Sequence, residues 1–359
     1  MQSLYLKIKH HGSSIAFVLG FIWDNIMLTR IDHAFANIML SSYLAISALS
    51  ILAMNIPAGN SNWHRKFIEG SAKWVPIILQ FCFGSLFSAY IVLYTRSASL
   101  ATDWPFLLFL VALVVSNELF RKRYLSITLP VSILFTVLFS YTIFLLPTFL
   151  GTMGPEIFVA SGALSLLVIF PFARTLKRIA RERFAESRRS LRISIITIYA
   201  LFNLAYYTNI IPPVPLSMKE IGVYHSISRQ VDGSYSLTFE PGAWYPFFTK
   251  SSNVFHQVND ERVFVWSAIF APTKLTVPVF HLWQYFDETD KVWVATDMVE
   301  FPIKGGREEG YRGYTIKSGV FPGRWRVDVQ TSRKDIIGRV EFTVVSESES
   351  NTKLVTERR

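Results

Sequence analysis

The sequence predicts a membrane α-helical unit of about seven transmembrane helices, followed by a C-terminal all-β sandwich. Three observations lead to this fold class. Long apolar runs fill the first 214 residues, whereas apolar and polar residues alternate with a period of two from residue 221 onward. Between the last two apolar runs, residues 174–192 hold eight basic and two acidic side chains. Lysine and arginine beside transmembrane helices stay on the cytoplasmic side, so this basic stretch sets the sidedness of the chain.

The composition indicates a chain divided into a membrane part and a globular part. Hydrophobic residues make up 51% of the 359 residues and charged residues only 17%, a balance that is unusual for a soluble protein. The net charge of +10 lies entirely in residues 1–214, while residues 215–345 carry 15 basic and 15 acidic residues. The excess charge therefore reports membrane topology. We expect no nucleic-acid partner, because such a partner needs a basic face on the folded domain.

The helical unit, residues 1–211, contains seven apolar runs, each close to the ~20 residues that cross a hydrocarbon core. They lie at about residues 14–28, 34–54, 74–94, 104–119, 125–150, 157–172 and 193–211. The first run is not a signal peptide, because no small-residue cleavage pattern follows it. With seven spans, the N-terminus and the loops on the side of the basic stretch hold 16 Lys and Arg residues, and the opposite side holds two. This asymmetry predicts a cytoplasmic N-terminus and an extracytoplasmic β domain.

The basic stretch also offers contacts to the inner leaflet of the bilayer. Apolar residues recur there at near-helical spacing with basic residues between them, which is typical of a short helix lying on a membrane surface. The simpler interpretation is a solvated loop with no lipid specificity, and we favour it over a dedicated site for anionic lipids. The side chains that would contact the headgroups are Arg174, Lys177, Arg178, Arg181, Arg188 and Arg189.

A proline-rich linker, residues 212–218, is expected to form a stiff, extended spacer before the β domain. The β domain follows at residues 219–345, and residues 346–359 form a polar tail that we expect to be disordered. About eight short strands are predicted, at residues 221–228, 235–239, 263–270, 279–286, 292–301, 311–317, 324–330 and 339–344. This pattern favours a β-sandwich, with an immunoglobulin-like arrangement as one candidate. The single cysteine, Cys82, lies in an apolar run, so the β domain has no disulfide.

Three segments carry a family resemblance. The C-terminal run FPIKGGREEGYRGYTIKSGVFPGRWRVDVQTSRKDIIGRVEFTVV resembles the bacterial family called domain of unknown function 2914. The upstream runs FIWDNIMLTRID and YYTNIIPPVPLSMKEIGVYH resemble the membrane half found with that domain in multi-pass proteins. The resemblance implies a bacterial origin, and hence a multi-pass protein of the inner membrane with a periplasmic β domain. It implies no activity and no catalytic residue.

Inside the membrane unit, the candidate polar residues are Asp24, Arg30, Asp32 and Asn203. An ionised aspartate at the bilayer centre costs about 2.5 to 3.5 kcal/mol, so Asp24 needs a partner or a polar path. A proton or ion relay generally shows several carboxylates within the membrane, and here only Asp24 lies well inside a span. We therefore favour a structural ion pair at the outer interface over a transport path.

In the β domain, residues 305–314 form a candidate binding loop. Its side chains Arg307, Tyr311, Arg312 and Tyr314 could contact a carboxylate, a phosphate or a sugar. Its glycines equally suit a wide hairpin loop, which we favour. No metal site and no cofactor is predicted, because the histidines lack ligand spacing. No nucleophile motif is present either, so the sequence gives no support for an enzyme.

These observations lead to a non-enzymatic hypothesis. The helices anchor the protein in the lipid bilayer, and the β-sandwich binds a glycan or a membrane or periplasmic protein of the cell envelope. The alternative is a transporter or membrane-embedded enzyme in which the β domain acts as a lid or accessory module. In that case Asp24, Arg30, Asn203, Tyr206 and Tyr207 would line the path.

Overall fold

The chain forms two compact units, with the boundary between Ile211 and Pro212. The structure is a computed structural model of the whole chain. It describes residues 34–57, 62–97, 108, 112, 126–242, 251–272, 275–306, 310–347 and 353–359.

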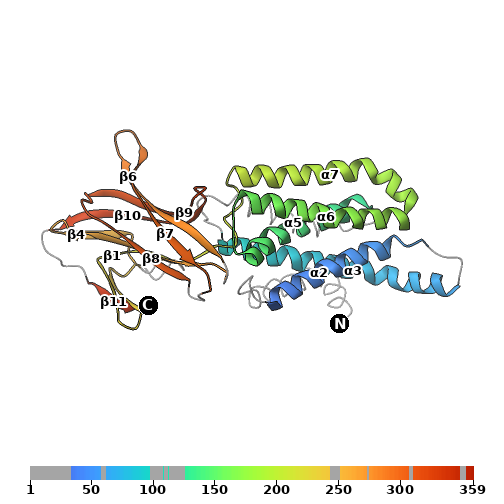
Figure 1. Cartoon of the computed structure of the whole chain (residues 1–359), viewed down its shortest axis with the longest axis horizontal. Coiled ribbons are helices and arrows are strands. Elements are labelled where there is room, and N and C mark those ends of the chain that lie inside the picture. The colour runs from blue at the N-terminus through green and yellow to red at the C-terminus, as the bar shows by residue number, and fades with distance from the viewer. Residues whose placement is uncertain are drawn as a thin grey trace, which may run out of the picture. The chain divides into compact units, whose positions relative to one another are not determined.

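The first unit is helical (Figure 1). Its long helices are α2 (Ala34–Met54), α3 (Asn62–Ser97), α5 (Thr128–Leu150), α6 (Pro155–Ile179) and α7 (Arg181–Tyr207). Each of these five helices is long and apolar enough to cross a membrane. Five such helices occur among the described residues, whereas seven spans were predicted for the whole chain. The predicted span at 14–28 lies outside those residues, as does all of the span at 104–119 except residues 108 and 112.

Local sequence explains where these helices begin and end. Gly151 ends α5 in the left-handed conformation at φ 72°, and its N–H donates to the carbonyl of Pro147, as in a common C-terminal cap. Pro155 then opens α6 at the first helical position, where its missing N–H costs no hydrogen bond. Pro130 lies in the first turn of α5 and is tolerated for the same reason.

Contacts between the helices fix their directions. Tyr90 of α3 donates to the carbonyl of Val137 in α5 at 2.8 Å, and the Tyr94 ring, one turn further along α3, packs against Phe144, two turns further along α5. The helices α3 and α5 therefore run parallel, so the end of α3 and the start of α5 lie at opposite ends of this unit. Ser41, near the start of α2, lies 2.8 Å from the hydroxyl of Tyr141, in the second half of α5. The helix α2 therefore runs opposite to α5.

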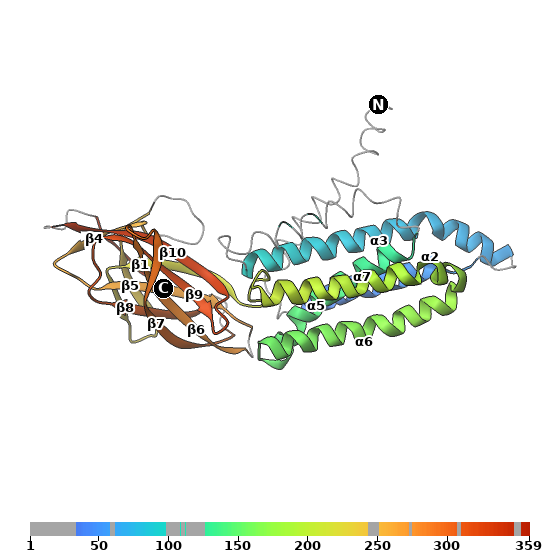
Figure 2. The same cartoon turned by 90° about the horizontal axis from the view of Figure 1, so that it is seen from above.

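The helices α6 and α7 form an antiparallel hairpin that turns at Ala180 (Figure 2). At this end, Thr128 at the start of α5 lies 2.7 Å from Ser190 of α7, between their hydroxyl oxygens. Residues 174–192 therefore form neither the loop nor the separate surface helix that was predicted. The stretch instead makes the last turns of α6 and the first three turns of α7, because its residues favour helix throughout.

The second unit consists of eleven strands among its described residues. They are β1 (Ser217–Tyr224), β2 (Ser226–Arg229), β3 (Tyr235–Phe239), β4 (Val254–Val258), β5 (Val263–Phe270), β6 (Thr276–Asp287), β7 (Val292–Lys304), β8 (Tyr311–Lys317), β9 (Gly323–Thr331), β10 (Ile336–Glu347) and β11 (Val355–Arg358). Three sheets result, with strand orders β1-β5-β8, β4-β10-β9-β6-β7 and β11-β3-β2. Neighbouring strands are antiparallel except β4 and β10, which pair in parallel. The prediction of a C-terminal β domain is confirmed.

The first two sheets pack face to face. His281 and Trp283 of β6 point away from solvent and bond to Ser267 of β5 and Thr315 of β8 across the interface. The opposite face of β5 carries Trp266, which packs with Tyr224 of β1 and with Ile227, Leu237 and Phe239 of the third sheet. The sheet β1-β5-β8 therefore lies between the other two.

Two predicted segments differ from the structure. Residues 212–218 are all buried and lead directly into β1, so they do not form an exposed spacer. Residues 353–359 are not a disordered tail, because Val355–Arg358 forms β11 and pairs with β3. The polar composition of this tail was misleading. Arg358 pairs with Asp232, and Arg359 lies 3.2 Å from Glu220, so its charges find partners on the β unit.

Candidate functional site

The outer face of the five-stranded sheet presents arginine and aromatic side chains, together with exposed Glu300 of β7 and Glu341 of β10. Successive side chains of a strand point to opposite faces. On β9, Trp325, Val327 and Val329 are buried in the core, so Arg324 and Arg326 point outward. Strand register then places neighbours beside them, with Gln284 of β6 opposite Arg326 and Trp293 of β7 opposite Phe286 of β6.

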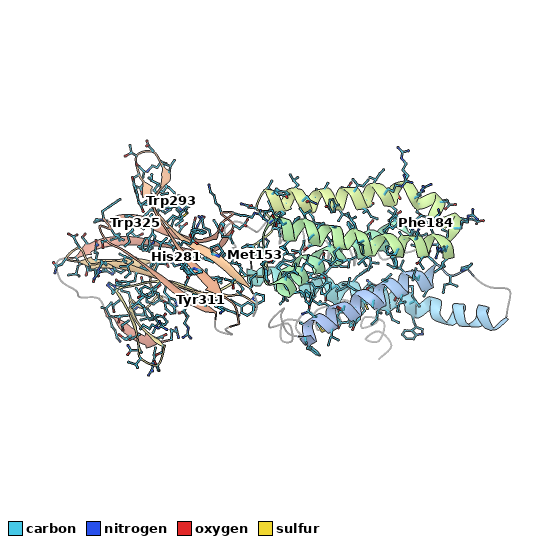
Figure 3. The ribbon with its side chains drawn as sticks, in the orientation of Figure 1. Met153, Phe184, His281, Trp293, Tyr311 and Trp325 are labelled. Atoms are coloured by element: carbon cyan, nitrogen blue, oxygen red, sulfur yellow. The ribbon has the colours of Figure 1, made fainter. Side chains whose placement is uncertain are left out.

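Four of these side chains form a stacked ladder. The Arg324 guanidinium lies 4.5 Å from the ring centre of Phe286 and 5.6 Å from that of Trp293. The Arg326 guanidinium lies 4.3 Å from the Trp293 ring. The rings of Phe286 and Trp293 meet edge to face at 5.2 Å. Trp293, together with the core residues Trp325 and His281, is labelled in Figure 3. We call Phe286, Arg324, Trp293 and Arg326 the arginine ladder.

A hydrogen-bonded row continues from the ladder across the sheet. Arg326 donates to Gln284 Oε1 at 2.8 Å, and Gln284 donates to Asp328 Oδ2 at 3.1 Å. Asp328 also accepts a hydrogen bond from Arg339 at 2.8 Å, which raises the pKa of Arg339. Burial and the nearby charge of Arg339 lower the pKa of Arg326, although it starts so high that the group stays protonated at neutral pH.

The charged side chains of this face differ in whether they have a partner of opposite charge. Arg339 neutralises the buried Asp328, and Glu341 lies opposite Arg326 on β10. Arg324 is exposed and forms no ion pair within the part of the chain that the structure describes. Stacked guanidinium groups keep their N–H edges available, and those edges match the two oxygens of a carboxylate or phosphate. This face can therefore bind an anionic group.

Of the four predicted intramembrane residues, the structure describes only Asn203. Asp24, Arg30 and Asp32 lie outside the described residues. Asn203 is half-buried and donates to the carbonyl of Tyr199 at 2.8 Å within its own helix. Nearby Tyr206 stacks on Phe158 of α6 with ring centres 3.8 Å apart. Tyr206 and Phe158 therefore make a packing contact between α6 and α7.

Of the four residues proposed for the binding loop, the structure describes three. Arg307 lies outside the described residues, while Tyr311, Arg312 and Tyr314 belong to β8 and pair with β5. Tyr314 packs against Phe264 and Tyr235, so its ring contributes to the contact between two sheets. A glycine at the start of the loop has a structural task, because a Cβ on Gly305 would lie 1.7 Å from the carbonyl oxygen of Pro272.

The six predicted inner-leaflet residues lie together near the turn between α6 and α7, close to Phe184 in Figure 3. All six side chains are exposed: Arg174, Lys177, Arg178, Arg181, Arg188 and Arg189. Arg174 lies 5.3 Å from the ring centre of Phe170, in the apolar part of the same helix.

A histidine and glutamate cluster in the β unit was missed by the sequence reasoning. His225 Nδ1 lies 2.7 Å from Glu261 and His225 Nε2 lies 3.0 Å from Glu240. His256 Nδ1 lies 2.7 Å from the other oxygen of Glu240. These residues are far apart in sequence and follow no motif, so no local pattern could have brought them together. Within the described residues, no group of three or more His, Cys, Asp or Glu side chains is placed to hold a metal ion.

The arginine ladder gave one local signal, the alternation of Arg324, Arg326, Asp328 and Gln330 with apolar residues on one predicted strand. That pattern identifies the outward face of β9. It does not identify Trp293 or Phe286 as partners, because these come from a hairpin some 40 residues earlier in the chain whose register the sequence leaves open.

Comparison with known proteins covers the same part of the chain. The model of the family described as Protein of unknown function (DUF2914) matches residues 277–344, a segment that contains the whole arginine ladder. This agrees with the resemblance at the C-terminal end. The comparisons name no multi-pass membrane relative, and no curated protein matches the chain.

Similarity to solved structures is weak. The beta-glucosidase from Kluyveromyces marxianus in complex with glucose is 12% identical, with a TM-score of 0.17, over 39% of this chain and 14% of that chain. The alkylpurine DNA glycosylase AlkC from Pseudomonas fluorescens, bound to DNA containing an abasic site analog, is 12% identical, with a TM-score of 0.23, over 87% and 100%. This chain thus spans 14% of the length of the beta-glucosidase. TM-scores this low carry no argument about fold or function.

Proposed function

We propose that the protein is a multi-pass protein of the bacterial inner membrane that holds a binding module on the periplasmic side. The observation that carries this proposal is the direction of α7. This helix begins at the basic turn with α6 and ends at the opposite end of the helical unit, where the chain continues into the β unit. If the basic turn is cytoplasmic, the β unit is extracytoplasmic.

The charge pattern of the neighbouring helix supports the same orientation. The start of α5 lies beside Ser190 of α7, at the basic end of the bundle. In the sequence, Arg121, Lys122 and Arg123 come shortly before α5. The basic turn thus forms one end of the bundle, and a second basic segment comes shortly before the helix that starts at that end. This is expected for the cytoplasmic end of a multi-pass protein. The predicted count of seven spans remains part of this proposal.

The strand order supports an immunoglobulin-like module. The sheets β1-β5-β8 and β7-β6-β9-β10 have the order of strands A-B-E and C′-C-F-G of that fold, and β4 lies parallel to β10 as an extra A′ strand does beside G. Trp283 on the C-like strand is fully buried, in the position of the core tryptophan that marks such domains. Sandwiches of this kind serve widely as cell-surface binding domains, so we propose that this module binds a glycan or a protein of the cell envelope.

Thiol labelling tests the orientation. In a Cys82→Ala background, Ala185→Cys places a thiol near the basic turn and Asp290→Cys places one at the exposed β6–β7 turn. We expect a membrane-impermeant maleimide to label Asp290→Cys in intact spheroplasts, and to label Ala185→Cys only after the membrane is opened. Labelling in the reverse order would refute the proposal.

A further inference from the structure

We infer that the outer face of the five-stranded sheet docks an acidic segment of a protein partner, with Arg324 and Arg326 binding its carboxylates. This inference rests on the proposed function, because it identifies the chemistry of the partner that the module would bind.

The ladder is already ordered for binding. Each guanidinium is held against an aromatic ring, so little side-chain freedom remains to be lost when a partner binds. Arg326 Nε is buried and has no hydrogen-bond partner among the described residues, while its other end is fixed by Gln284. Because Nε is shielded from solvent, a ligand would reach Arg326 through the other nitrogens of its guanidinium group.

Apolar side chains border the ladder on the same face. Strand register places Leu282 of β6 beside Met298 of β7, and Phe280 lies two residues further along β6. Met298 is 61% exposed, although it lies beside the hydrogen-bonded row of the sheet. Protein interfaces are enriched in aromatic residues, methionine and arginine at their centres, and this face combines all three.

The same geometry favours a protein over a glycan. Sugar rings bind proteins by stacking on open aromatic faces, but both guanidinium groups lie over the Trp293 ring. The ring therefore supports the arginines, and the N–H edges of the arginines are the groups left for a ligand. Exposed Glu341, opposite Arg326, would repel an acidic partner and weaken its binding.

A peptide-binding experiment tests the inference on the full-length protein in lipid nanodiscs. The probe is a fluorescein-labelled peptide that alternates Glu and Leu, and its matched control carries Gln in place of Glu; empty nanodiscs give the blank. We expect the Glu peptide to bind at least ~10-fold more tightly than the Gln peptide, with affinity that falls as salt is added.

Variants then locate the site. Arg324→Gln and Arg326→Gln should each weaken binding about 10-fold, and Glu341→Gln should strengthen it about threefold. The matched control Lys291→Gln, at the exposed β6–β7 turn, should leave the affinity unchanged. If an arginine variant fails to fold by circular dichroism, Met298→Glu tests the same face with the ladder intact and should also weaken binding.

Other results of the peptide experiment would overturn the inference. Absence of binding by the Glu peptide, equal binding of both peptides, or an affinity that no variant changes would overturn the inference. Binding of polygalacturonate in place of the peptide would also overturn it, because the ligand would then be an acidic glycan. The thiol-labelling result is independent of all these outcomes, so failure here would leave the proposed orientation standing.

Discussion

The most buried ionisable side chain of the β unit is His281. It bridges Ser267 and Thr315 with distances of 2.8 and 2.9 Å, and Trp283 also donates to Thr315. Burial lowers the pKa of His281 to about 3, so the ring stays neutral at physiological pH. It serves as a fully hydrogen-bonded part of the core between two sheets, which satisfies each polar group it buries.

This burial predicts a pH dependence of stability. The unfolded chain takes up a proton at His281 near pH 6.5, whereas the folded chain does so only near pH 3. The contribution of His281 is therefore fully present above pH 6.5 and is lost as the pH falls toward 3, by at most about 1.4 kcal/mol per pH unit. Thermal unfolding in detergent, followed by near-ultraviolet circular dichroism from pH 7 to 4, measures it. The variant His281→Asn should be less stable at pH 7 and show a shallower pH slope; an identical slope would contradict the prediction.

Among the secondary-structure elements, the histidine and glutamate cluster connects segments that no sheet joins directly. Glu240 follows β3 and is 5% exposed, yet it accepts hydrogen bonds from the backbone N–H of His256 in β4 at 2.7 Å and from two histidine rings. Because β3 belongs to the small third sheet and β4 to the five-stranded sheet, this carboxylate links the two.

Replacement of this carboxylate should therefore loosen the link. Glu240→Gln removes one acceptor and the negative charge, which should cost about 1 to 3 kcal/mol because buried donors lose their partner. Hydrogen exchange followed by mass spectrometry should show faster exchange in β3, β4 and β11. Glu288→Gln is the control, since its pair with Lys291 is exposed and should contribute little. Equal exchange in both variants would show that the cluster does not join the sheets.

The strands show what the sequence could and could not predict. Residues 235–239, 263–270 and 311–317 were predicted with the bounds that the structure has, because alternation over five to eight residues is a local signal. The short strand β4 was missed, since polar His256 and Gln257 interrupt its pattern. The strand β11 was missed because its apolar partners, including Leu237 and Phe239, lie more than 100 residues earlier in the chain.

At the scale of the whole molecule, the orientation that we propose depends on the charge of the basic turn. Helix lengths and loop charges are sequence-level properties, so the helices 34–54 and 125–150 could be located within a few residues. The sequence could not show that the basic stretch belongs to α6 and α7, because a charged helix end and a charged loop have the same composition. The candidate binding face also escaped prediction, since its ladder needs the register of β6, β7 and β9 together.

Removal of positive charge from this turn should disturb the orientation. Gln in place of Arg181, Arg188 and Arg189 weakens the retention of that end in the cytoplasm, so a fraction of chains should insert with reversed sidedness. The thiol at Ala185→Cys then becomes accessible in intact spheroplasts, as measured by maleimide labelling. Lys291→Gln is the matched control, because it removes charge outside the helical unit. Unchanged protection of Ala185→Cys would show that other charges set the orientation.

The parallel pairing of β4 with β10 has a consequence for biogenesis. Residues 254–258 cannot complete their ladder until residues 343–347 have been synthesised, and β11 joins β3 later still. Ladders of such high contact order form slowly. If the module is exported as we propose, most of it must cross the bilayer as an extended chain and close only after the last strands arrive. The periplasmic quality-control machinery would then encounter this protein chiefly as an unfinished sandwich with open strand edges.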